Sequence, residues 1–187
     1  MTGVILFGLG NPGPKYKLSR HNFGFMVLDA FAVSGWSKRK NYYYQRRDNY
    51  FLAKPRLFMN NSGPALASLL AYLRIKKKDI AENILVILDD YQIPFGQARL
   101  RSGGGDGGHN GLRSVIETLA TENFWRLRLG IGPLPAGINP ADFVLQNFSE
   151  LEQKNLSKIL EKITDWLNRL RDYSIKEAAS RWTNILL

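Results

Sequence analysis

Two glycine-rich turns, each placed directly after a run suited to a buried strand, constrain the fold of this chain most. The first covers residues 8–13 and follows the apolar run 4–7, and the second covers residues 103–111 and follows an expected strand at 98–101. Six of the nine residues in the second turn are glycine, and ordering so many glycines has a high entropic cost. Glycines allow a ligand to approach the backbone closely, so we expect a binding site at these strand ends.

Apolar runs of strand length alternate with stretches of helical periodicity along the chain. Strands are expected at residues 4–7, 83–88, 98–101 and 125–131, and a hairpin over 38–56 that turns near 48–49 and exposes one basic face. Helices are expected for about 12 residues after Asn22, which would cap the first of them, and then over 62–73, 112–119, 156–170 and 175–182. This alternation predicts α/β layers, and the 187 residues suit one domain spanning residues 1–187.

Composition narrows the chemistry further. The absence of cysteine excludes disulfides, a thiolate nucleophile and Cys-ligated metal sites. The 26 Lys and Arg against 16 Asp and Glu give a net charge of +10, which favours a polyanionic partner. Seven of these cations fall within residues 38–56, beside one acid and interleaved with tyrosines. No apolar run approaches the ~20 residues that span a bilayer, and the first residues lack the basic start of a signal peptide, so we expect a cytoplasmic protein without membrane contact.

Residues 8–13 also satisfy G-x-G-x-x-G after a strand, the pattern of a dinucleotide site. Pro12 and Pro14, however, remove two backbone donors that would hold a pyrophosphate. Asp29 has the spacing of a ribose-binding acid but falls within an expected helix. An NAD(P)-dependent oxidoreductase is therefore a remote alternative. The second turn lacks the Gly-Lys-Ser/Thr ending of a nucleotide-binding loop.

The two histidines of the chain, His21 and His109, each precede an asparagine and follow a polar or glycine-rich turn. An imidazole, with an ordinary pKa of about 6.5, can take a proton near neutral pH, and a carboxylate can orient it and stabilise its charged form. Asp89, expected where the buried strand 83–88 ends, is the candidate carboxylate. Each of these residues alone also has an ordinary structural explanation, but together they suggest a general base.

Three asparagines, Asn11, Asn60 and Asn110, lie in or beside loops near these histidines in the sequence. Their amides can donate hydrogen bonds to a carbonyl oxygen, so a base, a carboxylate and amide donors suit attack of an activated water on an ester or amide. No H-x-x-x-H or comparable cluster predicts a metal. No serine lies in a G-x-S-x-G elbow, so a covalent intermediate is not indicated.

In this combination of motifs the chain resembles the bacterial peptidyl-tRNA hydrolases. The motifs that carry the resemblance are Gly8-Leu9-Gly10-Asn11-Pro12-Gly13 with Lys15-Tyr16, Arg20-His21-Asn22-Phe23-Gly24, Lys54-Pro55, Phe58-Met59-Asn60-Asn61-Ser62-Gly63, Asp89-Asp90 before Pro94, and the loop 103–111. They occur in the family's order and cover most of the chain to about residue 148. The resemblance implies a single-domain, three-layer αβα fold with a twisted mixed central sheet. It also implies a cytoplasmic monomer that needs no cofactor or metal and hydrolyses the ester joining a peptide to the 3′ end of tRNA.

The resemblance assigns expected roles to individual residues. His21 is expected to be the general base that activates water, Asp89 to hold it in its basic form, and Asn11 to distinguish an N-blocked substrate from free aminoacyl-tRNA. The expected substrate-binding residues are Tyr16, Phe58, Asn60 and Asn110, with Met59 in the pocket wall, His109 behind the catalytic pair, and Arg101 and Arg128 as phosphate contacts. These two arginines and the hairpin cations have the charge that a tRNA backbone requires.

The sequence departs from the family pattern at three places. Gln92 replaces a second acid after the aspartate pair, the hairpin region 37–53 is shorter than usual, and the segment 133–139 lacks a basic residue often found there. The main alternative is a non-catalytic RNA-binding relative that serves in plastid intron splicing and would need an exposed apolar patch for a protein partner. We favour the enzyme because the expected active-site set is complete.

Overall fold

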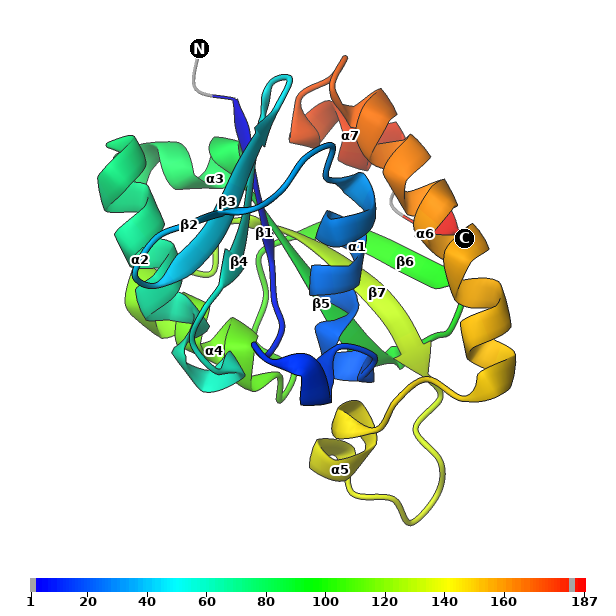
Figure 1. Ribbon diagram of the computed structural model, residues 1–187. Coiled ribbons are helices and arrows are strands. Elements are labelled where there is room, and N and C mark those ends of the chain that lie inside the picture. Colours follow the sequence, from blue (N-terminus) through cyan, green and yellow to red (C-terminus); the bar gives the residue numbers. More distant parts are fainter. Residues whose placement is uncertain (1–2, 182–183) are drawn as a thin grey trace.

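The computed structural model describes residues 3–181 and 184–187 of the chain. These residues contain one eight-stranded sheet with the strand order β2-β3-β4-β1-β5-β7-β6-β8 (Figure 1). The strands are β1 (Val4–Gly8), β2 (Ser37–Lys38), β3 (Tyr42–Arg47), β4 (Tyr50–Pro55), β5 (Ile84–Pro94), β6 (Gln97–Ser102), β7 (Trp125–Gly132) and β8 (Asn184–Leu186). The four central strands are parallel and the outer strands pair antiparallel, so the sheet is mixed as predicted.

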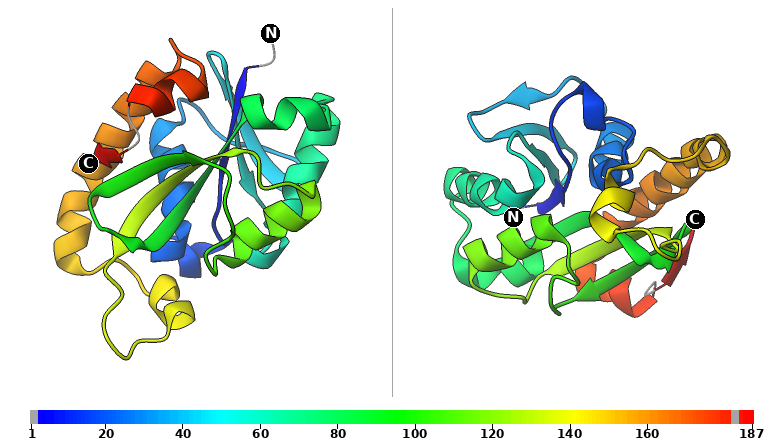
Figure 2. Two further views of the ribbon diagram at one scale, coloured as in Figure 1. Left: turned by 180° about the vertical axis from the view of Figure 1, so that it is seen from behind. Right: turned by 90° about the horizontal axis from the view of Figure 1, so that it is seen from below.

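Helices cover both faces of the sheet and complete three layers (Figures 1 and 2). Their bounds are α1 (Phe23–Phe31), α2 (Ser62–Leu73), α3 (Ile80–Asn83), α4 (Asn110–Leu119), α5 (Pro140–Leu145), α6 (Glu150–Leu170) and α7 (Ile175–Arg181). The α1, α6 and α7 helices pack on one face, and α2 and α4 pack on the other. The predicted three-layer αβα fold is therefore confirmed. Among the described helices, none combines the length and the apolar character needed to cross a bilayer.

The parallel strands β4, β1, β5 and β7 point the same way, so the segments that follow them meet at one edge of the sheet (Figure 1). Helices α2 and α4 approach closely near this edge. A Cβ at Gly63 would lie 2.0 Å from the backbone oxygen of Ser114, and the Gly63 amide donates to the Ser114 hydroxyl at 3.0 Å. This contact fixes α2 against α4, the two helices whose N-terminal ends border that edge.

Strand β5 is longer than the sequence indicated. The run 83–88 was expected to end before the aspartate pair, but β5 continues to Pro94 because β7 pairs with it beyond that point, with Asp89 opposite Leu129 and Asp90 opposite Gly130. The expectation that Asp89 ends a strand is therefore wrong. Its backbone lies inside a hydrogen-bonded ladder, which holds the side chain more rigidly than a turn would.

Other boundaries also differ from expectation. Helix α1 has 9 residues, and the side chain of Asn22 does not cap it. The hairpin turns at the expected residues, but β4 is buried throughout, including Lys54, whose ammonium group binds the Asp29 carboxylate. The predicted helix 156–170 begins earlier, at Glu150, and β8 was not predicted. Trp182, expected in the last helix, lies outside the described residues.

Candidate active site

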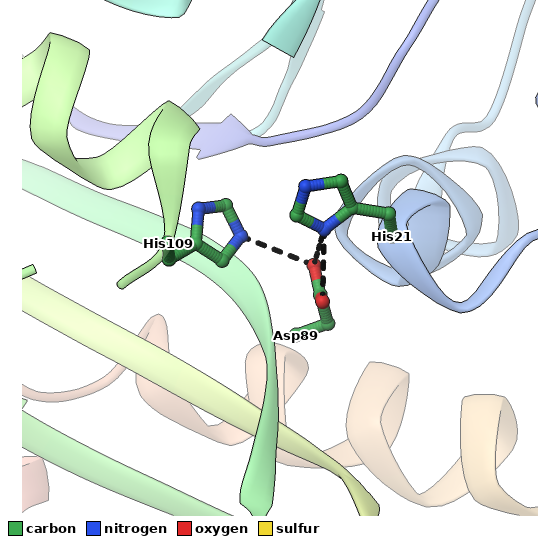
Figure 3. A group of neighbouring side chains, drawn as sticks. All are labelled: His21, Asp89 and His109. Carbon is green, nitrogen blue, oxygen red and sulfur yellow. Dashed lines mark hydrogen bonds and ion pairs between the residues drawn. The ribbon is translucent and has the colours of Figure 1, made fainter. Parts of the chain in front are cut away.

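A buried histidine–carboxylate pair lies at the edge where the parallel strands end (Figure 3). His21 belongs to the short 3-10 turn η2 (Arg20–Asn22), directly before α1, and Asp89 projects from β5. The Nδ1 atom of His21 lies 2.9 Å from each carboxylate oxygen of Asp89, and the two residues are 7% and 3% exposed. Because a carboxylate only accepts hydrogen bonds, His21 carries its proton on Nδ1 in the neutral state, and its Nε2 keeps a free lone pair.

His109 approaches the same carboxylate from the other side (Figure 3). Its Nδ1 accepts the backbone N–H of Leu112 at 3.2 Å and so caps α4, while its Nε2 lies 3.1 Å from Asp89 Oδ1. An imidazole whose Nδ1 accepts a hydrogen bond carries its proton on Nε2, so His109 donates to Asp89 in its neutral form. The rings of His21 and His109 lie with centroids 4.6 Å apart. His109 thus links the end of the glycine-rich turn to the Asp89 carboxylate.

The electrostatics keep Asp89 ionised. Burial alone would raise the pKa of this carboxyl, but attraction to His21 and His109, together with hydrogen bonds from both rings, lowers its pKa well below the ordinary range. A carboxylate that stays charged can stabilise positive charge on the His21 ring. The site therefore has the parts of a general base: an oriented imidazole, a fixed counter-charge and a ring nitrogen to which no described residue is bonded.

Asn11 is held beside His21 by a network that the sequence did not reveal. The backbone N–H of Asn11 donates to Asn22 Oδ1 at 2.8 Å, and Asn22 Nδ2 donates back to the Asn11 carbonyl at 2.9 Å. The side-chain oxygen of Asn11 accepts the backbone N–H of Met59 at 2.8 Å. This last bond fixes the amide orientation, so the NH₂ group of Asn11 remains available for a ligand.

Two adjoining cavities meet at His21. One, of about 290 Å³, is lined by Asn11, His21, Phe58, Met59, Asn60, Asn110, Ala141, Val144 and Leu145. The other, of about 320 Å³, includes His21, Asp89, Asp90, His109, Asn110, Arg128 and residues of α5. We call the two cavities together the cleft. The cleft therefore brings together the predicted residues Phe58, Met59, Asn60 and Asn110. The ring of Tyr16 lies edge-on to that of Phe58, with ring centroids 6.3 Å apart.

The two predicted phosphate contacts belong to a row of arginines on neighbouring strands. In the β6–β7 ladder Arg99 lies opposite Arg128 and Arg101 lies opposite Arg126, so all four project from the same face. We call them the arginine strip. Arg99 and Arg101 are exposed, and Arg101 lines neither cavity of the cleft. Arg128 instead lines the cleft and pairs with Asp90 at 2.6 Å.

Arg126 is the buried member of the arginine strip, and it binds the backbone of the glycine-rich turn. It is 2% exposed and donates to the backbone oxygens of Gly105, at 2.9 Å, and Glu122, at 3.1 Å. Burial lowers the pKa of Arg126 to about 10. The turn is therefore tied to the sheet by a charged side chain, although glycine makes up most of its sequence.

Arg20 is a positioning residue that the sequence analysis missed. Its guanidinium forms two hydrogen bonds to Glu152 of α6, at 2.6 and 2.7 Å, and lies over the rings of Phe143 and Phe148. Glu152 also closes the capping box of α6 with Ser149. Because Arg20 directly precedes His21, this contact anchors the turn η2. The Ser-x-x-Glu pattern was the sequence signal that could have drawn attention to Glu152.

The structure also bears on metal and cofactor binding. Among the described residues, only His21, Asp89 and His109 have the spacing of a three-ligand metal group. Hydrogen bonds already join the Asp89 carboxylate to His21 Nδ1 at 2.9 Å and to His109 Nε2 at 3.1 Å. A metal ion would have to replace the bonds to both histidines. The G-x-G-x-x-G turn leads into the three-residue η1 (Pro14–Tyr16), not into a helix whose N-terminus faces the glycines. A pyrophosphate would lack its usual partner there.

These features define an α/β protein with a buried histidine–carboxylate pair at an open cleft, the arrangement of an enzyme that activates water. Comparison with known proteins gives the family. The model of the family described as peptidyl-tRNA hydrolase matches residues 5–185, and the chain belongs to this family.

Curated relatives and solved structures agree with this assignment. The peptidyl-tRNA hydrolase of Pseudothermotoga lettingae is 39% identical over 94% of both chains, and that of Geobacter metallireducens is 40% identical over 98% of this chain and 96% of its own. The crystal structure of peptidyl-tRNA hydrolase from Acinetobacter baumannii superposes with a TM-score of 0.81 at 27% identity, covering 97% of this chain and 95% of that one.

Proposed function

We propose that this protein hydrolyses the ester between a peptide, or an N-blocked aminoacyl group, and the 3′ end of tRNA, and so releases free tRNA for reuse. The observation that supports this most directly is the geometry of His21, whose Nδ1 is held by Asp89 while its Nε2 has no partner among the described residues. His21 lines both cavities of the cleft, so a water bound at Nε2 can reach an ester placed there.

In the first step, His21 Nε2 takes a proton from water as the water oxygen attacks the ester carbonyl. The imidazolium that forms donates from Nδ1 to Asp89, whose negative charge stabilises it. The carbonyl oxygen becomes an oxyanion, and the amides of Asn60 and Asn110, which line the cleft beside His21, are the available donors to it. Positioned acid–base catalysis contributes about 10²–10⁴-fold to such a reaction.

In the second step, the tetrahedral intermediate collapses and the bond to the ribose oxygen breaks. The proton on His21 Nε2 passes to that oxygen, which leaves as the hydroxyl of tRNA, and the peptide leaves as a free carboxylic acid. His21 returns to the neutral form with Nδ1 still donating to Asp89. These two steps account for every atom and proton of the hydrolysis without a covalent enzyme intermediate or a cofactor. We propose that the protein uses neither a cofactor nor a metal.

Asn11 selects for a blocked amino group in this proposal. Its oxygen is taken by the Met59 amide, so its NH₂ group donates to the carbonyl of the peptide bond next to the ester. A free aminoacyl-tRNA offers an amino group at that place, with an ordinary pKa of about 7.7–8.0, and its protonated form can only donate. Two donors would face each other, and the substrate would bind less tightly in a productive position.

Arg101 and Arg128 are proposed to contact tRNA phosphates next to the cleft. Arg101 is exposed, and Arg128 already faces the cleft, where its pairing with Asp90 leaves it partly accessible. Each phosphate contact on a duplex steepens the decline of log K with log salt by about 0.9. Arg101→Ala should therefore reduce that slope by about one such unit without affecting the chemistry at His21.

The test is turnover of N-acetylaminoacyl-tRNA by the wild type, by His21→Ala and by Lys158→Ala, an exposed lysine on α6 that serves as the control. We expect multiple turnovers by the wild type and the control and a loss of at least 10²-fold in His21→Ala. A folded wild type that binds tRNA but does not release the acyl group would refute the proposal and favour the RNA-binding alternative. Saturable NAD(P) binding would instead support the oxidoreductase alternative.

Residues 1–187 are further proposed to act as one domain and as a monomer in the cytoplasm, where the tRNA substrate occurs. One sheet includes both β1 and β8, which lie near the two ends of the chain, and this supports the single domain. Sedimentation of the purified protein at micromolar concentration would show a species of 21.3 kDa. A stable dimer would contradict the monomer.

A further inference from the structure

The basic and aromatic hairpin noted in the sequence forms a surface that the proposed hydrolysis does not use. Along β3 the side chains alternate between the two faces of the sheet. Gln45 and Arg47 point toward α1 and the segment that follows it, where Arg47 donates to the Phe31 carbonyl. Tyr44 and Arg46 lie on the face that α2 covers, where Tyr44 meets Tyr72 of α2 and Arg46 lies over the ring of Phe51 on β4.

On the face that α2 covers, aromatic rings and guanidinium groups stack on one another. The rings of Tyr44 and Phe51 are stacked with centroids 5.5 Å apart and planes 3° apart, and the Arg39 guanidinium lies 3.9 Å from the centre of the Tyr72 ring. Tyr72 is 43% exposed although it is a large aromatic residue. We call Arg39, Tyr44, Arg46, Phe51 and Tyr72 the α2-side surface; Arg39, Arg46 and Tyr72 are its exposed members, Tyr44 is half-buried and Phe51 is buried. Flat groups of this kind are the ones on which nucleic-acid bases stack.

A cavity of about 280 Å³ continues the α2-side surface toward the end of α2. Its lining includes Arg46, Asn49, Phe51, Leu73 and Ile75, so it has apolar walls with a cation and an amide at the rim. It is also lined by Asp48, whose carboxylate lies within 4 Å of Arg47 and Arg171 and is balanced by them.

Several cations lie close in the chain to residues that line this cavity. The segment after α2 adds Arg74, Lys76, Lys77 and Lys78 to the cations of the hairpin, and Asp79 is the next acid in the chain. Among the described residues, none of these four cations has an ion pair within 4 Å. Uncompensated cations next to the exposed Tyr72 ring and an apolar cavity match a phosphate backbone with unpaired bases.

The α2-side surface is separate from the arginine strip, two of whose members, Arg101 and Arg128, are proposed to contact tRNA phosphates. Strands β3 and β6 are five positions apart in the sheet order, which corresponds to about 24 Å at ~4.8 Å per strand. Helices α2 and α4 cover the face between them (Figures 1 and 2). The two surfaces therefore border opposite sides of the α2–α4 layer and do not form one continuous track.

We propose that the α2-side surface and its cavity bind a single-stranded RNA segment, with a base stacked on the exposed ring of Tyr72 and the phosphates paired with Arg39, Arg46 and the cations after α2. Duplex RNA fits less well, because its bases are already stacked and present only an outer edge. An acidic protein segment would use the cations but not the aromatic rings.

The test measures binding of a fluorescent 12-nucleotide single-stranded RNA by anisotropy, at several salt concentrations. Tyr72→Ala should weaken binding by about 5-fold or more, the lower end of one lost stacking contact, and Tyr72→Phe should retain it because the ring remains. Arg46→Ala should lower the slope of log K against log salt by about 0.7, the value for one phosphate of a single strand. The matched control is Arg169→Ala, an exposed arginine of α6 on the other face of the sheet, which should leave both quantities unchanged.

A second comparison separates this proposal from the hydrolase. Tyr72→Ala should leave turnover of N-acetylaminoacyl-tRNA within twofold of the wild type, whereas Arg101→Ala should weaken tRNA binding and leave binding of the 12-nucleotide RNA within twofold. The proposal is overturned if the single strand does not bind at low salt, if Arg169→Ala or Arg101→Ala weakens it as much as Tyr72→Ala does, or if Tyr72→Phe behaves like Tyr72→Ala. Equal affinity for a duplex of the same length, or for polyglutamate, would overturn it as well.

Discussion

Replacing Asp89 with asparagine tests the mechanism most directly, because His109 determines how the new amide sits. The Nδ1 of His109 is occupied by the Leu112 amide, so its Nε2 can only donate in the neutral form. The oxygen of the new amide must therefore take the Oδ1 position, which accepts from both histidines. His21 then keeps an acceptor for its Nδ1 proton at the Oδ1 position but loses the one at Oδ2, so the substitution removes the negative charge and one of two acceptors.

The expected loss follows from the interaction of two charges. At an effective dielectric constant of about 20, a carboxylate and an imidazolium about 4 Å apart attract by about 4 kcal/mol. This corresponds to about 10³-fold in kcat, since each 1.36 kcal/mol is a factor of ten. Removing His109 as well would let the amide rotate and place its NH₂ group against His21 Nδ1, which favours the wrong tautomer. The Asp89→Asn/His109→Ala variant should therefore lose more, toward the ~10⁴-fold cost of a wrong tautomer in a catalytic triad.

The assay is single-turnover release of the acyl group from N-acetylaminoacyl-tRNA at pH 7, with thermal unfolding of each variant as the folding control. His109→Ala alone should cost less than tenfold, because Asp89 still holds His21. Retention of more than a tenth of the wild-type rate by folded Asp89→Asn would refute the stabilisation of the imidazolium. Equal rates for the single Asp89→Asn variant and the double variant would refute the role of His109 in orienting the amide.

Four further outcomes are expected. Asn11→Asp keeps the acceptor but removes the donor proposed to bind the peptide carbonyl, so kcat/KM for N-acetylaminoacyl-tRNA should fall by about 10- to 100-fold, as for a lost hydrogen bond of 1–3 kcal/mol; an unchanged value would contradict the assigned orientation. Gly63→Ala places a Cβ 2.0 Å from a backbone oxygen of α4 and should lower Tm by about 4–12 °C, as expected for overpacking by 2–3 kcal/mol; a Tm equal to that of the wild type would show that the helices can separate. The pKa of Glu152 is raised by burial but lowered on balance by the hydrogen bonds from Arg20 and Ser149, so the pair stabilises the fold above the ordinary glutamate pKa of about 4.3 and loses this effect as pH falls further. Tm should thus fall less in Glu152→Gln than in the wild type between pH 6 and pH 3. Incubation with EDTA should leave turnover unchanged, and a loss restored by a divalent cation would contradict the proposed metal-independent mechanism.

The fold was largely predictable because its signals are local. Short apolar runs such as 4–7 and the periodicity of α6 identify strands and helices from neighbouring residues alone. The extension of β5 was missed because Asp89 and Asp90 resemble the end of a strand, whereas their backbone is held by β7, about 40 residues later in the chain. Pairing between distant segments overrides the local preference of aspartate for turns.

The candidate site was predicted as a set of residue types but not as a network. His21, Asp89 and the three asparagines were expected near one cleft, and the structure places them there. Asn22 was expected to cap α1, since asparagine commonly does so, but it bonds both backbone groups of Asn11 instead. Such a bridge depends on where two turns meet in space, and no spacing along the chain encodes it.

The bond between Arg20 and Glu152 has a consequence for how the site is assembled during synthesis of the chain. Asn11, His21 and Asp89 all precede α6 in the chain, but the carboxylate that anchors the turn carrying His21 belongs to that later helix. The turn that carries His21 is therefore fixed to α6 only after that helix has been made and has docked on the sheet.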